Sequence, residues 1–342
     1  MTEKKPITYR DAGVDIDAAT DALSGAKADI TATHGPNCLS GVGSYGGLFR
    51  VPVEEYREPV LVSSTDGVGT KIKVALLAGR YDSVGQDIVN HCVDDILVQG
   101  ARPLYFLDYF GTGHVRAEVF RGIVSGVARA CRENGCALLG GETAEMPDVY
   151  GREDFDLVGT IVGIVDRDRI IDGRDVTPGD RLIGLPSTGL HTNGYTLARK
   201  ILLEREGNTV DSTLPGLEGT LGDELLKVHR SYLGDVMPLL DDGLLKSMAH
   251  ITGGGLPDNL PRVIPAGTAI RIQRDAWEVP PIFQHLAELG PVPVDDCYRT
   301  FNMGIGMVLI VGPDVEDEVR ERVGESFPIG EVVAGDRTVE LI

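Results

Sequence analysis

Carboxylates and glycines gather in several short segments whose residue types suit phosphate chemistry. Residues 65–71 read Thr-Asp-Gly-Val-Gly-Thr-Lys and follow an apolar stretch that is typical of a strand. Glycines let a ligand approach the backbone closely. Asp66 offers a hard oxygen for Mg²⁺, and Lys71 offers a point charge for phosphate. The same pattern also fits a tight turn with a solvated aspartate, so this segment alone indicates only a candidate phosphate site.

Two further acidic segments could complete an all-oxygen metal site with Asp66. Asp94 and Asp95 stand side by side within an apolar helical pattern, where buried, unpaired carboxylates would be costly. Glu142 follows a short apolar stretch and two glycines. Asp66, Asp95 and Glu142 together would suit Mg²⁺ rather than Zn²⁺. The alternatives are one aspartate at a polar helix edge with the other in solvent, and a turn or helix-cap role for Glu142.

A glycine-rich loop at residues 41–47 is a second candidate for holding phosphates. Gly41, Gly43 and Gly46 fit the G-x-G-x-x-G spacing, but in dinucleotide-binding folds that motif follows a strand and opens a helix. Here a polar loop precedes it and an extended segment follows, so a dinucleotide role is not expected. The chain also has no Walker A pattern. A flexible loop whose backbone N–H groups wrap phosphates is favoured, and a plain loop is the alternative.

Two segments in the second half of the chain could line a ligand pocket. Residues 187–194 place hydroxyls, an amide and glycines around His191, which could move a proton near neutral pH. A lone histidine in a polar loop is more often structural. Residues 253–255 are consecutive glycines before a predicted helix start, and helix N-termini suit phosphate. An ordinary turn is the alternative there.

Strand and helix patterns alternate along the 342 residues, which predicts an α/β or α+β fold with two domains. A charged stretch at residues 166–179 carries Pro178 and marks the predicted boundary between domains 1–170 and 171–342. The predicted helices span residues 15–27, 85–99, 115–134, 194–206 and 221–240. The predicted strands span residues 60–64, 104–109, 137–139, 155–165, 181–185 and 306–311, the final one being taken as the last strand.

Composition narrows the class of partner. The net charge is −20, from 52 acidic and 32 basic residues, which argues against a surface for nucleic acid or anionic membrane. The five cysteines form no C-x-x-C pair, so neither a disulfide framework nor a zinc site is expected. The N-terminus lacks the apolar run of a signal peptide, and no stretch approaches the ~18–20 apolar residues of a membrane span. A cytoplasmic protein is therefore expected.

Taken together, these segments resemble the phosphoribosylformylglycinamidine cyclo-ligase family, also called aminoimidazole ribonucleotide synthetases. The resemblance runs nearly end to end, through residues 9–16, 63–71, 94–101, 106–109, 140–147, 189–195, 253–255 and 301–307. It implies a homodimer whose N-terminal sheets join across the two-fold axis into a barrel-like assembly, with ATP sites near that interface. The C-terminal half would be a mixed-sheet α/β domain that completes a substrate cleft. Asp94 stands where many relatives carry Asn, which leaves open whether Asp94 or Asp95 meets the metal.

The resemblance also implies a reaction and a set of residues. ATP and formylglycinamidine ribonucleotide would give aminoimidazole ribonucleotide, ADP and phosphate, a step of purine synthesis. The implied cofactor is Mg²⁺, with ATP as co-substrate and K⁺ as a further candidate ion. The implied catalytic residues are Lys27, Asp66, Asp95 and His191, and the implied metal ligands are Asp66, Asp95 and Glu142. The implied nucleotide-binding residues are Gly41, Gly43, Ser44, Gly46, Gly47, Lys71 and Thr143. The implied substrate-binding residues are Asp108, Thr188, Asn193, Gly253, Gly254 and Gly255.

Two alternative functions stay open for this chain. One is another ATP-dependent member of the same superfamily, such as thiamine-monophosphate kinase or selenophosphate synthetase. The kinase lacks the long segment seen here at residues 189–194, and the synthetase usually carries a reactive Cys or selenocysteine in a glycine loop, whereas the motifs around Cys38 do not fit it. The other is a non-catalytic nucleotide sensor, which would keep the glycine loops and lose the acidic residues.

Overall fold

Four segments of the first half are strands, and residues 155–163 alternate between buried and half-buried positions, as a strand with one covered face does. In the computed structural model, which describes residues 7–342, the four strands form a mixed sheet in the order β1–β4–β2–β3. The strands are β1 (Pro59–Gly67), β2 (Arg102–Thr112), β3 (Ala137–Glu145) and β4 (Phe155–Asp166). Strands β2 and β3 pair in parallel, and β4 is antiparallel to both of its neighbours, β1 and β2.

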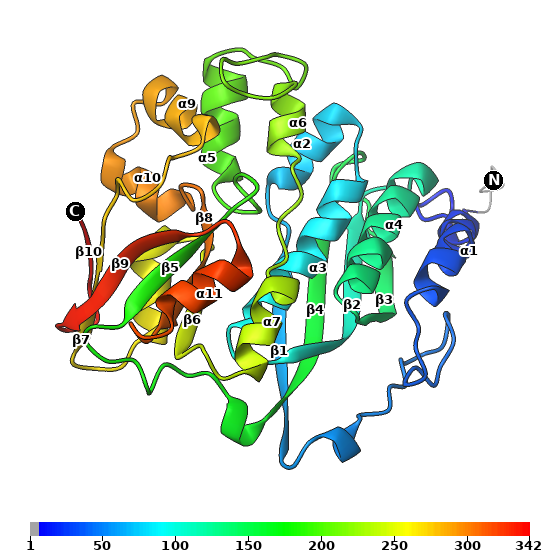
Figure 1. Ribbon diagram of the computed structural model, residues 1–342. Coiled ribbons are helices and arrows are strands. Elements are labelled where there is room, and N and C mark those ends of the chain that lie inside the picture. Colours follow the sequence, from blue (N-terminus) through cyan, green and yellow to red (C-terminus); the bar gives the residue numbers. More distant parts are fainter. Residues whose placement is uncertain (1–6) are drawn as a thin grey trace, which may run out of the picture.

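Helices cover one face of this sheet (Figure 1). They are α1 (Ile16–Thr31), α3 (Asp82–Leu97) and α4 (Ala117–Glu133), while α2 (Lys71–Ala78) contacts α3 and two helices of the second half. Helices α3 and α4 cross closely because glycines stand at the contact: a Cβ added at Gly126 would lie 2.0 Å from the carbonyl oxygen of Asp82. On the opposite face of the sheet, Leu61 is 55% exposed, and the hydroxyls of Thr65 and Thr160 pair across β1 and β4 at 2.8 Å.

The second half forms a six-stranded mixed sheet in the order β10–β7–β9–β5–β8–β6. Its strands are β5 (Arg181–Pro186), β6 (Ser247–His250), β7 (Thr268–Ile272), β8 (Ile305–Val311), β9 (Phe327–Ala334) and β10 (Val339–Leu341). Strand β8 is buried along its whole length, which its uninterrupted apolar sequence predicts for a central strand. It lies between β5 and β6, at the centre of the domain core.

Helices cover both faces of the second sheet, as the two clusters of buried apolar side chains around it indicate. Helices α7 and α11 pack on one face, with β5 and β8 beneath them. The helices of this half are α5 (Tyr195–Arg199), which continues into a π-helical stretch (Lys200–Arg205), α6 (Leu221–Leu225), α7 (Leu233–Asp241), α8 (Gly255–Asn259), α9 (Pro281–Leu289), α10 (Val294–Thr300) and α11 (Glu316–Val323). Short 3₁₀ turns lie at Val53–Glu55, Arg167–Arg169 and Leu260–Val263.

The predicted two-domain α/β architecture is confirmed, although several elements differ from those predicted, among them the following two. The single helix predicted over residues 221–240 is two helices, α6 and α7, because the chain between them turns to meet α3. There the backbone N–H groups of His229 and Tyr232 donate to the carboxylates of Asp87 and Asp94 at 2.7 and 2.9 Å. Residues 306–311 are also not the last strand, since β9 and β10 follow them.

The proposed domain boundary at residue 170 falls between the two sheets, after β4 ends at Asp166 and before β5 begins at Arg181. We keep domains 1–170 and 171–342 as our proposal. Helix α3 lies where the two halves meet, and nearly all of its residues are buried. Within residues 7–342, no helix is long and apolar enough to cross a membrane. The five cysteines are free thiols.

Candidate functional site

A cavity of about 730 Å³ lies beside the glycine-rich loop, α1, α4 and strands β2 and β3. It brings together most of the predicted nucleotide-binding residues, which are Gly41, Gly43, Ser44, Gly46, Gly47 and Thr143. Glu142 lines the same cavity. A Cβ added at Gly47 would lie 2.4 Å from the Leu139 side chain, so glycine lets the loop rest against β3. The loop follows no strand and opens no helix, in agreement with the rejected dinucleotide role.

Asp108, predicted to bind substrate, also lines this glycine-loop cavity. It stands on β2 opposite Gly141 of β3, where an added Cβ would lie 2.2 Å from the Asp108 Oδ1 atom. Burial raises the pKa of the Asp108 carboxyl to about 7. The residue therefore presents a carboxyl group that changes charge near neutral pH, next to the loop that is the candidate phosphate cradle.

A second cavity, of about 460 Å³, opens where β1, α3 and β6 meet. Asp66 of β1 and Asp95 of α3 line it, together with two histidines that were not predicted, His91 and His250. The Nε2 atom of His91 lies 2.9 Å from Asp66 Oδ2, and the Nδ1 atom of His250 lies 2.9 Å from Asp95 Oδ1. Ser64 donates its hydroxyl to Asp95 Oδ2 at 2.9 Å. Each carboxylate of the cavity therefore has an imidazole partner.

These pairings set the charges in the second cavity. Burial by itself raises the pKa of Asp66, but the hydrogen bond and charge of His91 outweigh it, so the pKa is lowered. Burial lowers the pKa of His91, and the bond to Asp66 with the charges of Asp95 and Asp66 reverses this, so the pKa is raised. Asp95 also has a lowered pKa, because His250 and His91 outweigh its burial. Both carboxylates are thus held in the anionic form that binds cations.

The donor set of the second cavity fits a divalent cation in part. One ligand atom each from Asp66, His91 and Asp95 lies within 4.8 Å of the others, and the Asp66 side chain is 47% exposed to the cavity. Carboxylate oxygens with room for water suit Mg²⁺. Asp94 does not share this site, since it is fully buried and accepts the N–H of Tyr232. Asp95 is therefore the aspartate of the pair that faces the cavity.

Glu142 does not lie with Asp66 and Asp95 within one chain, so its role as a metal ligand stays a prediction. Strands β1 and β3 are the two edges of the first sheet. Three strand spacings of roughly 4.8 Å separate them, so Glu142 lies about 14 Å or more from Asp66. The linear sequence gave no sign of this, because strand order is a property of the folded sheet.

Lys71 is also not where a phosphate-binding lysine would be, which corrects that prediction. It begins α2 and is fully buried, and its Nζ lies 2.7 Å from Asp87 Oδ2. Its ammonium also donates to the carbonyl oxygens of Lys227 and His191, at 2.6 and 3.1 Å. These partners use all the donors that a lysine has. Lys71 fastens the two domains together rather than lining the glycine-loop cavity.

His191 is 1% exposed and lies inside the domain junction. The backbone N–H of Thr188 donates to its Nε2 at 3.2 Å, and its ring stacks on His229 with centroids 4.0 Å apart. Burial, with the charge of His250 adding to it, holds the pKa of His191 well below its usual range. A neutral, enclosed imidazole does not support the predicted proton transfer. The remaining predicted role of His191 is to help position the substrate. The Thr188 hydroxyl donates a hydrogen bond to the carbonyl oxygen of Val228.

The turn at Gly253, Gly254 and Gly255 has a structural reason for its glycines. Gly254 and Gly255 have φ of +95° and +58°, and a Cβ added at Gly255 would lie 1.8 Å from the Tyr298 carbonyl oxygen. The Asn259 amide donates to the Gly255 carbonyl at 2.9 Å and so holds the turn. Asn193 lies next to it, since a Cβ at Gly253 would be 3.3 Å from its Oδ1 atom. Helix α8 is too short to serve as an anion site.

Lys27 lies on the exposed side of α1, between Leu23 and Ile30, which both line the glycine-loop cavity. Its predicted catalytic role stays a prediction. Sequence reasoning missed His91, His250 and Arg262, which all line the second cavity. One signal for His91 existed, because residues four apart share a helix face and Asp95 follows it at that spacing. Nothing local marks His250.

Comparison with known proteins defines the class. The chain matches the family model described as AIR synthase related protein, N-terminal domain, over residues 50–165, and its C-terminal counterpart over residues 177–342. A thiamine-monophosphate kinase from Stenotrophomonas maltophilia K279a shares the fold, with a TM-score of 0.68 and 17% identity over 95% of each chain. This is thus a two-domain protein of the AIR-synthase-related class.

Full-length relatives narrow the class to a family. A protein of Geotalea uraniireducens is 48% identical over 100% of both chains, and one of Geobacter metallireducens is 50% identical over 99% of both. Each is named phosphoribosylformylglycinamidine cyclo-ligase. The chain belongs to the phosphoribosylformylglycinamidine cyclo-ligase family.

Proposed function

We propose that the chain is an ATP-dependent ligase that converts formylglycinamidine ribonucleotide to aminoimidazole ribonucleotide, with release of ADP and phosphate, in purine biosynthesis. The observation that carries this conclusion is the identity of 48–50% over essentially the whole length of proteins with that name. Free thiols support a cytoplasmic location as part of the proposal.

The reaction needs an activated amide oxygen, because oxygen alone is a poor leaving group. Transfer of the γ-phosphoryl group from ATP to that oxygen gives an iminophosphate and ADP. The amine nitrogen of the same substrate then attacks the activated carbon, the C–N bond closes the imidazole ring, and phosphate leaves with the oxygen while the nitrogen loses a proton. Catalysis of this kind is mainly positioning and charge neutralisation.

The two cavities supply separate parts of that task. The glycine loop, with Ser44 and Thr143, offers backbone and hydroxyl donors for the nucleotide phosphates. The second cavity offers Asp66 and Asp95 as anionic oxygens, with Arg262 as a cation for an anionic substrate group. Bound Mg²⁺ would neutralise phosphate charge. Asp66 and Asp95 would hold it, with Mg²⁺ favoured over softer ions by their oxygen atoms.

We further propose that a homodimer completes the nucleotide site. The glycine-loop cavity and the Asp66–Asp95 cavity lie toward opposite edges of the first sheet, so one chain does not bring phosphate cradle and carboxylates together. The helix-free face of this sheet exposes Leu61, with Tyr105 and Val162 half-exposed on it. Packing of two such faces, as in stacked sheets about 10 Å apart, would place edge residues of one chain near those of the other.

The deciding experiment is a product assay on purified full-length protein with ATP and Mg²⁺. ADP release should depend on formylglycinamidine ribonucleotide and match the formation of a diazotisable aminoimidazole. Thiamine monophosphate serves as the control substrate and should give no ADP. Repeating the assay with K⁺ exchanged for Na⁺ tests the monovalent ion. ADP formation that is equal without the ribonucleotide, or no ADP at all, would remove the ligase proposal.

Asp66 is tested by Asp66→Asn, which keeps the shape of the side chain and removes its charge. We expect turnover to fall by at least ~10²-fold, as is typical when a key electrostatic group is lost. Asp275→Asn, at an exposed aspartate far along the chain, is the matched control and should keep full turnover. Near-normal turnover of Asp66→Asn would place Asp66 outside the reacting site.

A further inference from the structure

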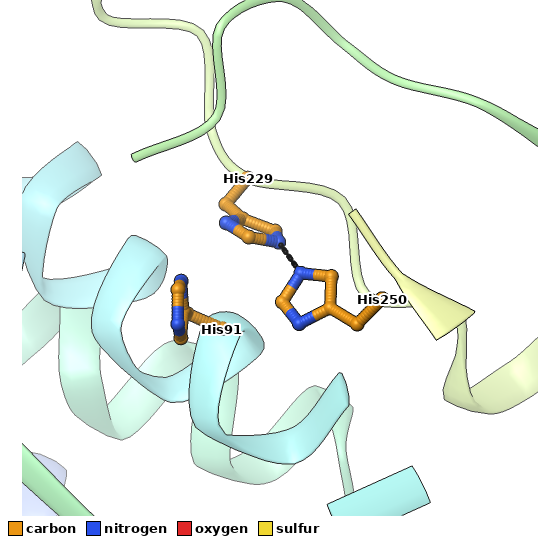
Figure 2. A group of neighbouring side chains, drawn as sticks. All are labelled: His91, His229 and His250. Carbon is orange, nitrogen blue, oxygen red and sulfur yellow. Dashed lines mark hydrogen bonds between the residues drawn. The ribbon is translucent and has the colours of Figure 1, made fainter. Parts of the chain in front are cut away.

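Three histidines from both domains converge beside the second cavity. His91 belongs to α3, His229 lies in the link between α6 and α7, and His250 ends β6. One ring nitrogen from each lies within 4.8 Å of those of the other two. Figure 2 shows the three side chains next to one another, with His229 and His250 joined by a hydrogen bond. The predicted oxygen-only site for Mg²⁺ includes none of these residues.

The spacing of the three rings is that of imidazoles around one ion. The ring centroids of the three pairs are 5.0, 5.1 and 5.3 Å apart, and the planes cross at 62° to 71°. The Nε2 atoms of His229 and His250 lie 3.1 Å apart. Imidazoles bound to a tetrahedral ion at ~2.0–2.1 Å would have centroids about 5.2 Å apart and nitrogens about 3.3 Å apart. The His229–His250 pair needs only a small shift to receive an ion, and a His91 nitrogen lies within 4.8 Å of both.

The outer nitrogens of the rings are held in the way that metal-binding histidines require. Asp95 Oδ1 lies 2.9 Å from His250 Nδ1, so a proton on that nitrogen leaves the Nε2 lone pair facing inward. Thr192 Oγ1 lies 3.4 Å from His229 Nδ1 and 2.8 Å from His91 Nδ1. His91 would give up one of its two hydrogen bonds, to Thr192 or to Asp66, when it binds an ion.

Within the described part of the chain, a buried carboxyl oxygen without a hydrogen-bond partner lies beside the triangle. Asp94 Oδ2 is enclosed and has no hydrogen-bond partner among residues 7–342. It lies 3.5 Å from His229 Nε2, at the inner side of the triangle. A buried and unpaired carboxylate oxygen is costly, and a cation held by the three imidazoles would relieve that cost. The cavity of about 460 Å³ lined by His91 and His250 provides access from solvent.

We propose that His91, His229 and His250 form a binding site for a nitrogen-preferring divalent cation of the Zn²⁺ type, beside the carboxylate site, with which it shares His91. Imidazole ligands favour Zn²⁺ and its transition-metal neighbours, whereas Mg²⁺ prefers oxygen. His91 comes from the first domain and the other two from the second. An ion bound to all three therefore ties the domains together at the floor of the second cavity, and its binding favours the folded chain.

The test is equilibrium dialysis of chelator-stripped, full-length protein against Zn²⁺ with a large excess of Mg²⁺, with the bound metal counted by mass spectrometry. We expect one Zn²⁺ per chain. His229→Gln should weaken the affinity by at least ~10²-fold, beyond the ~10–100-fold typical of losing a supporting hydrogen bond. His285→Gln, on α9 with its ring bonded to the Pro215 carbonyl, is the control and should bind like the unaltered chain.

Asp66→Asn separates this site from the carboxylate site, and it should keep the Zn²⁺. Three results would each overturn the proposal. They are Zn²⁺ binding well below one ion per chain, equal loss of Zn²⁺ affinity in His229→Gln and His285→Gln, and loss of Zn²⁺ in Asp66→Asn while His229→Gln retains it. To cover the case in which His229→Gln does not fold, X-ray absorption of the Zn²⁺-loaded, unaltered chain gives a second answer. Scattering from three imidazoles supports the site, and an all-oxygen shell refutes it.

Discussion

A buried ammonium ion must be neutralised and hydrogen-bonded within the protein, and Lys71 meets both conditions. Its side chain and that of Asp87 are each 0% exposed, and the pair spans the junction between α2, α3 and the second domain. Replacement of both charges by apolar groups of similar volume is often tolerated, whereas removal of one charge leaves the other buried without a partner. Substitutions in the Lys71–Asp87 pair can therefore show whether Lys71 is a structural lysine or a phosphate-binding lysine.

Lys71→Met should lower the free energy of unfolding by about 3–5 kcal/mol, because it leaves Asp87 buried without a counter-charge. The double variant Lys71→Met/Asp87→Leu should recover most of that loss. Lys73→Met is the matched control: its ion pair with Asp154 is 39% and 42% exposed, so the loss should stay below about 1 kcal/mol. Denaturant titration measures all three. A stable Lys71→Met with a raised KM for ATP would restore the phosphate role.

Asp108 predicts a pH dependence of stability. Its pKa is about 7 in the folded chain, against about 3.9 for an unfolded aspartate. Between these pH values the folded state holds a proton that the unfolded state has lost. The stabilising contribution of the Asp108 proton to the free energy of unfolding is therefore complete below about pH 4 and is lost as pH rises through 7.

The unfolding free energy of the unaltered chain minus that of Asp108→Asn should therefore decrease by up to about 4 kcal/mol between pH 4 and pH 8, at about 1.4 kcal/mol per pKa unit. Urea titrations of the ligand-free protein at several pH values measure this difference. Asp275→Asn, an exposed site, should give a difference that stays flat. A flat difference for Asp108→Asn as well would mean that its pKa is not raised.

At the scale of elements, the crossing of α3 and α4 fixes where His91 and Asp95 stand. The two helices approach through Gly85 and Gly126, where added Cβ atoms would lie 2.1 and 2.0 Å from backbone carbonyl oxygens of the facing helix. Backbone cannot move aside as a flexible side chain can. The amphipathic pattern of each helix predicts which face is buried, but it does not predict how closely the two axes approach.

Gly126→Ala should destabilise the chain by about 1–3 kcal/mol, because the methyl group forces α3 and α4 apart. Gly234→Ala is the matched control within α7, since nothing lies within 4 Å of its added Cβ. There alanine should stabilise by up to about 1 kcal/mol through its better helix propensity. Thermal and denaturant unfolding measure both changes. Equal effects of the two substitutions would show that the helix crossing is not tight.

For the whole molecule, the helix-free face of the first sheet is the main surface left to explain. An exposed leucine on a flat strand face invites association with another sheet. Standard interfaces bury about 1,600 Å² in total, which a four-stranded sheet face can supply. This is the physical support for the proposed dimer, and the dimer in turn would bring the separated carboxylates and glycine loop together.

Leu61→Asp should shift the protein from dimer to monomer and remove most of its ligase activity, because a charge would be buried at the joined sheet faces. Leu77→Asp is the control: this leucine is 61% exposed, against 55% for Leu61, and belongs to α2, outside that face. Light scattering coupled to gel filtration measures the mass of each. A monomeric unaltered chain with full activity would contradict the dimer proposal.

The sequence by itself determined the features that depend on neighbouring residues along the chain. Alternation of apolar and polar residues predicted most of the strands and helices of the first half and the α/β class, and the length of 342 residues predicted two domains. The short segments around Asp66, Asp95 and the glycine loop marked the residues that line the two cavities. Periodicity, turn chemistry and residue type depend on neighbours along the chain, so they are readable without the fold.

Only the tertiary structure decided which of these residues meet. His250 reaches Asp95 across 155 residues, Glu142 is held away from Asp66 by the order of the strands, and Lys71 is buried instead of free. The convergence of three histidines depends on the packing of one domain against the other. Such contacts follow from strand order and from the way helix α3 is buried between the domains, and neither is encoded in the spacing of residues along the chain.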